Sequence, residues 1–291
     1  MSSPPSVMYG LELPDFDRWS DRVCVALGQN PGVFTGPGTN TYLVGTGSER
    51  ILLDTGARLP EYLPVLAGAL EQERCTIQEI VLTHGHGDHI GGASGVIANY
   101  GALRVSKHPW PKHDELHPLE ITSLSEGDVI ETEGATLRAV HTPGHAVDHL
   151  CFVLEEERSL FSGDNVLGVG TTVIPAEGGD LGDYMDSLHR ILSEAPTTLY
   201  PAHGPCIREG TNKVQEYIDH RNDREHQIAS ALGEGPRRIP EIVKVVYAAY
   251  PEALHAPAGQ SVCSHLKKLE KENRVARTND APPIDAIWEL T

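Results

Sequence analysis

The chain has 291 residues, a formal net charge of −18 and 39% hydrophobic residues, values that describe a globular protein and exclude a disordered or fibrous one. Because protein domains typically contain about 150 residues, this length favours two domains. Residues 221–291 carry ten basic and ten acidic side chains, so the whole acidic excess falls in residues 1–220. Because tracking a polyanion needs surface Lys and Arg, no extended nucleic-acid groove is expected.

The five cysteines are odd in number, widely spaced and free of any Cys-X-X-Cys pair, which argues against a disulfide framework and favours a reducing compartment. The sequence has no apolar run of about 18 residues, so neither a membrane-spanning helix nor a membrane partner is expected. The first 21 residues lack the cationic start and apolar stretch of a targeting peptide. These features predict a cytoplasmic protein, with the mitochondrial matrix as the alternative in a eukaryotic source.

Apolar periodicity predicts alternating strands and helices along most of the chain. The expected strands lie at 40–44, 51–54, 79–83, 102–107, 135–141, 149–154, 159–163 and 197–201, and the expected helices at 61–72, 182–194 and 211–232. A Gly-Glu-Gly-Pro break at 233–236 then predicts a domain boundary, with a catalytic domain over 1–232. Residues 233–291, with helices at 240–249 and 260–271 and a β-like tail at 287–290, have the outline of a winged-helix domain. This pattern indicates an α/β protein with sheets covered by helices.

A cluster of metal-binding residue types follows the predicted strand at 79–83. His84, His86, Asp88 and His89 fall within six residues, in a turn that contains two glycines. Three further candidates stand at strand-to-loop junctions of the same kind: His145, Asp164 and His203. Imidazole and carboxylate donors without thiolate suit Zn²⁺, Mn²⁺ or Fe in an open, catalytic site. The sequence therefore predicts a catalytic metal centre.

In chain order, these residues resemble the five motifs of the metallo-β-lactamase superfamily of hydrolases, over most of residues 20–210. The resemblance implies an αββα sandwich and two divalent metal ions, most simply Zn²⁺, that share an activated hydroxide. It assigns the ligands as follows: His84, His86 and His145 to one ion, Asp88, His89 and His203 to the other, and Asp164 as the bridge between them. Asp88 would also orient the hydroxide as the catalytic residue, and Asp54 would fix the histidine loop through hydrogen bonds, although a turn-capping role suits Asp54 as well.

The carboxylates Asp88 and Asp164 resemble the glyoxalase II and RNA-processing type of the superfamily rather than the true β-lactamases. Segments 27–32, 38–45 and 265–270 further resemble the lactamase-beta-like protein 2 group over nearly the full chain. That group includes an animal mitochondrial endoribonuclease that acts on single-stranded RNA and fungal thioesterases that release polyketides from acyl carrier protein. Many of its members carry Trp where this chain has Gly85, so a more open pocket wall is expected here.

Three functions follow as alternatives. The first is cleavage of short single-stranded RNA. A basic stripe on the winged helix supports this function, and it is formed by Lys267, Lys268, Lys271, Arg274 and Arg277. The same side chains also fit an ordinary solvated helix face paired with acids, and the neutral domain charge favours that interpretation. The second function is hydrolysis of a small thioester or other acyl bond, with weak β-lactam hydrolysis as a side activity. The third is a non-catalytic scaffold, against which the complete ligand set argues.

Overall fold

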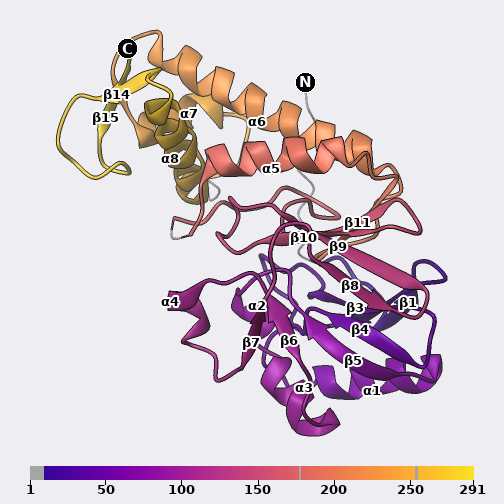
Figure 1. Ribbon diagram of the computed structural model, residues 1–291. Coiled ribbons are helices and arrows are strands. Elements are labelled where there is room, and N and C mark those ends of the chain that lie inside the picture. The colour runs from indigo at the N-terminus through magenta and orange to yellow at the C-terminus, as the bar shows by residue number, and fades with distance from the viewer. Residues whose placement is uncertain (1–9, 177, 253–254) are drawn as a thin grey trace.

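A computed structural model describes residues 10–176, 178–252 and 255–291. Its first layer of strands is a seven-stranded sheet (Figure 1). The strands run in chain order: β1 (Phe16–Arg18), β2 (Val23–Leu27), β3 (Asn40–Val44), β4 (Glu49–Leu53), β5 (Thr76–Val81), β6 (Val105–Lys107) and β7 (Ile121–Ser123). Neighbours are antiparallel from β1 to β4 and parallel from β4 to β7.

A second sheet of five strands packs against the first. Its order is β12 (Thr198–Pro201), β11 (Ser159–Gly163), β10 (Leu150–Leu154), β9 (Ala135–His141) and β8 (Val129–Thr132). Only β11 and β12 pair in parallel. Apolar side chains from both sheets, among them Leu53, Phe152 and Tyr200, form one core between them. Because the outer faces are covered too, every residue of β2, β3, β10 and β11 is buried.

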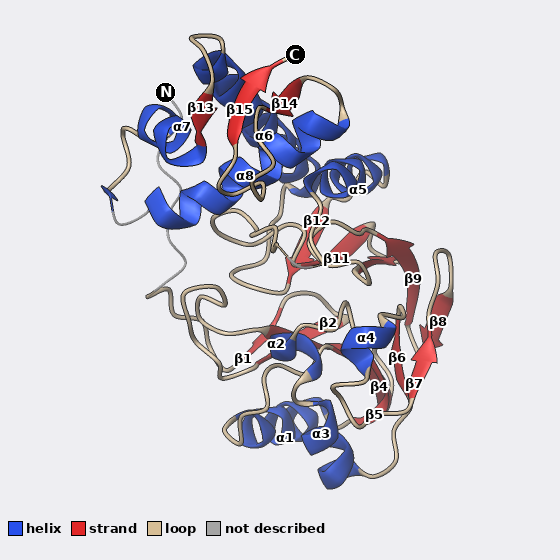
Figure 2. Cartoon of the chain, turned by 90° about the vertical axis from the view of Figure 1, so that its left-hand side faces the viewer, coloured by secondary structure: helices blue, strands red, loops and turns tan. Residues whose placement is uncertain are grey.

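Helices cover the two outer faces. Helices α1 (Tyr62–Glu73) and α3 (Ala93–Tyr100) pack on the first sheet, and α5 (Leu181–Ser193) and α6 (Gly210–Leu232) pack on the second. Two short helices, α2 (Gly87–Ile90) and α4 (Pro111–Asp114), lie next to each other in Figure 2. The expected αββα sandwich is confirmed.

The C-terminal residues form the expected winged helix. Helices α7 (Ile239–Val246) and α8 (His255–Lys271) pack with the end of α6 around the buried Trp288. A small sheet completes the unit, in the order β13 (Arg237–Arg238), β15 (Ile287–Leu290) and β14 (Val275–Arg277). The domain boundary at residue 232 stays a prediction, although α6 ends at that residue.

Helix α8 begins five residues earlier than the sequence predicts. Pro257 is the third residue of the helix, a first-turn position at which the missing backbone N–H costs nothing, so the proline that favoured a connector is compatible with the helix start. Residues 253–254 of the predicted connector and residues 1–9 of the N-terminal segment inspected for targeting lie outside the described residues.

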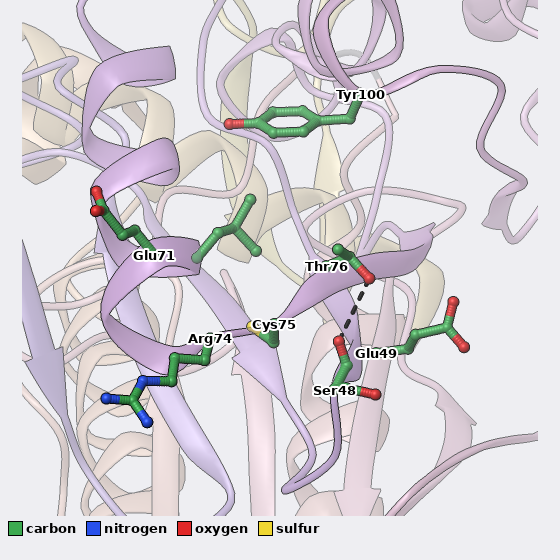
Figure 3. A pocket seen from close by; sticks show the side chains of 8 residues that line it. Ser48, Glu49, Glu71, Arg74, Cys75, Thr76 and Tyr100 are labelled. Carbon is green, nitrogen blue, oxygen red and sulfur yellow. Dashed lines mark hydrogen bonds between the residues drawn. The ribbon is translucent and has the colours of Figure 1, made fainter.

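All five cysteines are free thiols. Within the described residues, no helix has both the length and the hydropathy needed to cross a bilayer. A pocket of about 580 Å³ opens at the end of α1, beside the turn between β3 and β4 and the start of β5 (Figure 3). Its lining, which includes Arg74, Cys75 and Tyr100, contains none of the predicted metal ligands, so it is separate from the site described next.

Candidate metal centre

The histidine cluster forms the link between β5 and α2. His84 and His86 occupy the loop after β5, and α2 begins at Gly87, so that Asp88 and His89 stand in its first turn. His84 and His89 are fully buried, whereas the side chain of Asp88 is 27% exposed. The loop and the helix therefore direct one pair of histidines and the Asp88–His89 pair to two adjacent positions.

The remaining candidates come from the second sheet. His145 lies in the loop between β9 and β10, Asp164 directly follows β11, and His203 comes two residues after β12. Strands β11 and β12 are parallel neighbours, so Asp164 and His203 leave the same edge of the sheet. All seven predicted ligands, which lie beyond the ends of strands from both sheets, are brought together in overlapping groups.

The ring nitrogens of His84, His86 and His145 form the first group. His86 Nδ1 lies 3.0 Å from His84 Nε2 and 3.1 Å from His145 Nε2. Burial together with neighbouring histidines lowers the pKa of His84, and the same causes lower the pKa of His86 to about 4. Neutral imidazoles, which these shifts favour, are the form that binds a metal ion.

Asp88, His89 and His203 form the second group, and Asp164 stands between the two. Oδ1 of Asp164 lies 3.2 Å from His203 Nε2 and 3.5 Å from His89 Nε2, while its Oδ2 lies 3.3 Å from Nε2 of His145 in the first group. Oδ2 of Asp88 lies 3.4 Å from His203 Nε2. One carboxylate thus faces both groups with different oxygens, a position that suits a bridging ligand.

Opposite charges dominate the electrostatics of the second group. Burial alone would raise the pKa of Asp88, but His89 and His203 lower it to about 2. Burial alone would lower the pKa of His203, but Asp164 and Asp88 raise it to about 9. The carboxylates are thus ionised and hold protons on the neighbouring imidazoles, and a divalent cation would take the place of these protons.

Two buried atoms of this cluster test whether a metal fits. His89 Nε2 and Asp164 Oδ1 have no hydrogen-bond partner, and an unsatisfied buried polar atom is costly. Each belongs to a group whose donor atoms all lie within 4.8 Å of one another. Imidazole nitrogens and carboxylate oxygens are the donors of catalytic Zn²⁺ sites, so the residues fit divalent ions.

Hydrogen bonds hold the rings by their far nitrogens. Asp54 Oδ2 lies 2.8 Å from His89 Nδ1, and Asp54 Oδ1 accepts from the backbone N–H of Thr83 at 2.8 Å. The carbonyl oxygen of Val173 lies 2.8 Å from His145 Nδ1. Asp54 thus contacts the far nitrogen of His89, a contact of the kind that orients a metal-binding histidine.

Sequence reasoning gave Thr83 no role and left His149 open between a contact to substrate or a ligand and a structural role. The hydroxyl of Thr83 lies 3.0 Å from His84 Nδ1 and also donates to Asp54. His149 is fully buried, and its Nε2 accepts from the backbone N–H of Asp164 at 3.1 Å. A Cβ at Gly163, which has a φ of +49°, would come within 2.4 Å of that ring nitrogen. The glycine before Asp164 is therefore the signal in the sequence for this close approach.

The more open pocket wall expected at Gly85 is not found. A Cβ at this position would lie 3.1 Å from His113 Nδ1, 3.1 Å from Asp148 Oδ2 and 3.5 Å from Lys107 Cε. Side chains from β6, from α4 and from the loop before β10 thus occupy the space beside the glycine.

The chain belongs to the metallo-β-lactamase superfamily. Residues 34–203 match the model of the metallo-beta-lactamase superfamily, and residues 239–288 match that of the beta-lactamase associated winged helix domain. With the fold described above, these matches define a metallo-β-lactamase superfamily hydrolase with a C-terminal winged helix.

Individual relatives are similar over nearly the whole chain. A "Beta-lactamase-like protein 2 homolog" of Drosophila melanogaster is 40% identical over 96% of this chain and 98% of its own length. An "Atrochrysone carboxyl ACP thioesterase" of Aspergillus chevalieri is 40% identical over 91% of this chain and 86% of its own length. A crystal structure of a beta-lactamase domain protein from Burkholderia ambifaria, 18% identical, has the same fold with a TM-score of 0.79 over 99% of this chain and 95% of that one.

Proposed function

We propose that this chain is a hydrolase that uses two divalent metal ions, most simply Zn²⁺, to cleave small acyl thioesters. The observation that carries the proposal is the position of Asp164, whose two oxygens face two separate groups of imidazoles. His84, His86 and His145 would hold one ion, and Asp88, His89 and His203 the other. Mn²⁺ and Fe suit the same donors.

Bound divalent ions would lower the pKa of a bound water. Their positive charge would offset the negative charge of the developing oxyanion. Asp88 is the most exposed of the ligand carboxylates, so it would orient the attacking water towards the substrate. Water adds to the carbonyl carbon, the C–S bond breaks, and a carboxylic acid and a thiol are released. Asp54, through His89, would keep the second group of ligands in place.

The cations of the winged helix favour a thioester over RNA. Lys268 pairs with Glu225 and Glu272, and Arg277 pairs with Glu270. The other two paired cations have partners of the same kind: Arg274 with Glu225 and Glu272, and Lys271 with Asp180. Four of the five residues of the basic stripe are thus neutralised by carboxylates within the molecule, and binding of a polyanion would have to break these pairs.

The similarity to a protein named as an acyl carrier protein thioesterase supports the same choice. RNA cleavage remains the alternative to test, because water activated at the same metal centre could attack a phosphodiester. Cleavage of RNA would be expected to weaken with added salt, since phosphate contacts release counterions.

The test compares hydrolysis of the acetyl thioester of N-acetylcysteamine with cleavage of a labelled single-stranded RNA. Thiol release should occur with the wild-type protein and fall about 10²-fold to 10⁴-fold in Asp88→Asn. His189→Ala, an exposed histidine of α5, is the matched control and should keep full activity. Cleavage of RNA without thioester turnover, or full thioesterase activity in Asp88→Asn, would overturn the proposal.

A further inference from the structure

Two aromatic rings outside the ligand set lie beside the metal centre. The ring centre of Trp110 is 6.2 Å from that of His86, and the ring centre of His113 is 6.3 Å from it. Trp110 and His113 stack on each other, with 4.5 Å between ring centres and 19° between planes. Both side chains are only half-buried. We call this pair the aromatic wall, and Figures 1 and 2 show its helix α4 next to α2.

A buried ion cluster fixes the aromatic wall from behind. The ammonium of Lys107, whose side chain is fully buried, lies 2.7 Å from Asp114 Oδ1 and 2.8 Å from Asp148 Oδ2. Asp114 Oδ2 accepts from the backbone N–H of Trp110 at 2.8 Å. Because an unpaired buried ammonium would be strongly unfavourable, this cluster ties α4 to the loop that carries His145.

Two glycines bring the aromatic wall close to the rest of the site. A Cβ at Gly85, between His84 and His86, would lie 3.1 Å from His113 Nδ1. A Cβ at Gly178 would lie 2.6 Å from Trp110 Cη2. Because both positions lack a side chain, the rings pack directly against backbone on either side. The aromatic wall is therefore preplaced, and its two rings stay partly exposed beside His86.

We propose that the aromatic wall is the subsite for the acyl group of the substrate and selects aromatic or other planar acyl groups over short aliphatic ones. This inference rests on the proposed thioesterase function. Offset stacking on Trp and His and burial of apolar area would favour a planar acyl group beside the reacting carbonyl. Removal of one ring should then weaken binding of an aromatic thioester roughly tenfold and leave binding of an acetyl thioester nearly unchanged.

The test uses benzoyl and acetyl thioesters of the same thiol with Trp110→Ala and Trp110→Phe. Trp110→Ala should raise KM for the benzoyl thioester about tenfold, with kcat, bound metal and the acetyl KM within about twofold of wild type. Trp110→Phe should restore most of the selectivity. Leu116→Ala, 72% exposed just beyond α4, is the matched control and should change neither KM. Equal changes for both thioesters, or loss of metal, would overturn the inference.

A binding measurement separates this inference from the proposed function. Binding of 2-naphthoate and of hexanoate by metal-loaded wild type and Trp110→Ala, followed by equilibrium dialysis, requires no turnover. If the wild type hydrolyses neither thioester but Trp110→Ala binds naphthoate more weakly than the wild type does, the proposed function fails and the aromatic subsite stands. If adenosine monophosphate binds more tightly than 2-naphthoate and displaces it, the wall binds nucleobases, and its assignment to an acyl group is overturned.

Discussion

On the proposed assignment of two ions, replacement of Asp54 by Asn should weaken binding of the ion held by Asp88, His89 and His203. Asp54 is 1% exposed and has a φ of +60°, a backbone conformation that Asn also tolerates. Its two oxygens face donors on both sides, the backbone N–H of Thr83 and Nδ1 of His89. In either orientation, the amide of Asn would turn an N–H towards one of these donors and would lack the negative charge.

The expected magnitude follows from these contacts. Hydrogen bonds to a charged acceptor contribute about 1.5–3 kcal/mol, so the metal-free variant should lose about that much unfolding free energy. Groups that orient a metal-binding histidine typically contribute about 10-fold to 100-fold to metal affinity, which is about 1.4–2.7 kcal/mol. The dissociation constant of the ion held by His89 should rise by that factor.

Dialysis against a graded chelator followed by elemental analysis measures the effect. Wild type should retain two ions per chain at chelator concentrations that leave Asp54→Asn with one. Asp128→Asn is the matched control, since Asp128 lies in an exposed turn and accepts from the backbone N–H of Ser125. Identical metal retention in Asp54→Asn and wild type would show that Asp54 supports the fold alone, and the reasoning would be refuted.

Three further outcomes are expected. Gly163→Ala should lower the unfolding free energy in urea by about 2 kcal/mol or more, because its Cβ would clash with His149, whereas Gly127→Ala, with positive φ but open space, should cost only about 1 kcal/mol. Burial, reinforced by Arg221, holds the pKa of His265 well below 6.5, so the unfolded chain takes up that proton first as pH falls. Unfolding free energy should therefore drop below pH 6.5 by up to about 1.4 kcal/mol per unit, and this component should vanish in His265→Leu. Chelation of bound metal should abolish thioester hydrolysis, and added Zn²⁺ should restore it; activity that survives complete metal removal would contradict the metal assignment.

The seven proposed ligands could be picked out from the sequence because each stands near a strand end and within a few residues of a glycine. Spacing in the sequence already places His84 and His86 one way and Asp88 and His89 another. The partners of these residues could not be predicted in the same way. Thr83 and His149 act through hydrogen bonds to residues that are distant in the sequence, such as Asp54 and Asp164, and no local pattern encodes these contacts.

Several elements of the fold were missed for a similar reason. The run Val23–Leu27 is a fully buried strand, yet its five residues show no alternation and become a strand through pairing with β3. Helix α3 contains Gly95 and buries only Ala93 and Val96, so its propensity and periodicity are both weak. Short elements of this kind depend on tertiary contacts more than on their own sequence.

Helix α6 and the winged helix that follows it both contact the segment that supports His145. Arg221 of α6 donates to the carbonyl oxygen of Thr172 at 2.7 Å, and the Thr172 hydroxyl lies 3.3 Å from His145 Nδ1. Lys271 of α8 pairs with Asp180, whose carboxylate caps the first turn of α5. Both cations are thus engaged with the segment between β11 and α5 that lines the site. Because these two cations hold the segment in place, they are not free to bind a polyanion, and this charge pattern supports the proposed hydrolysis of a small neutral thioester.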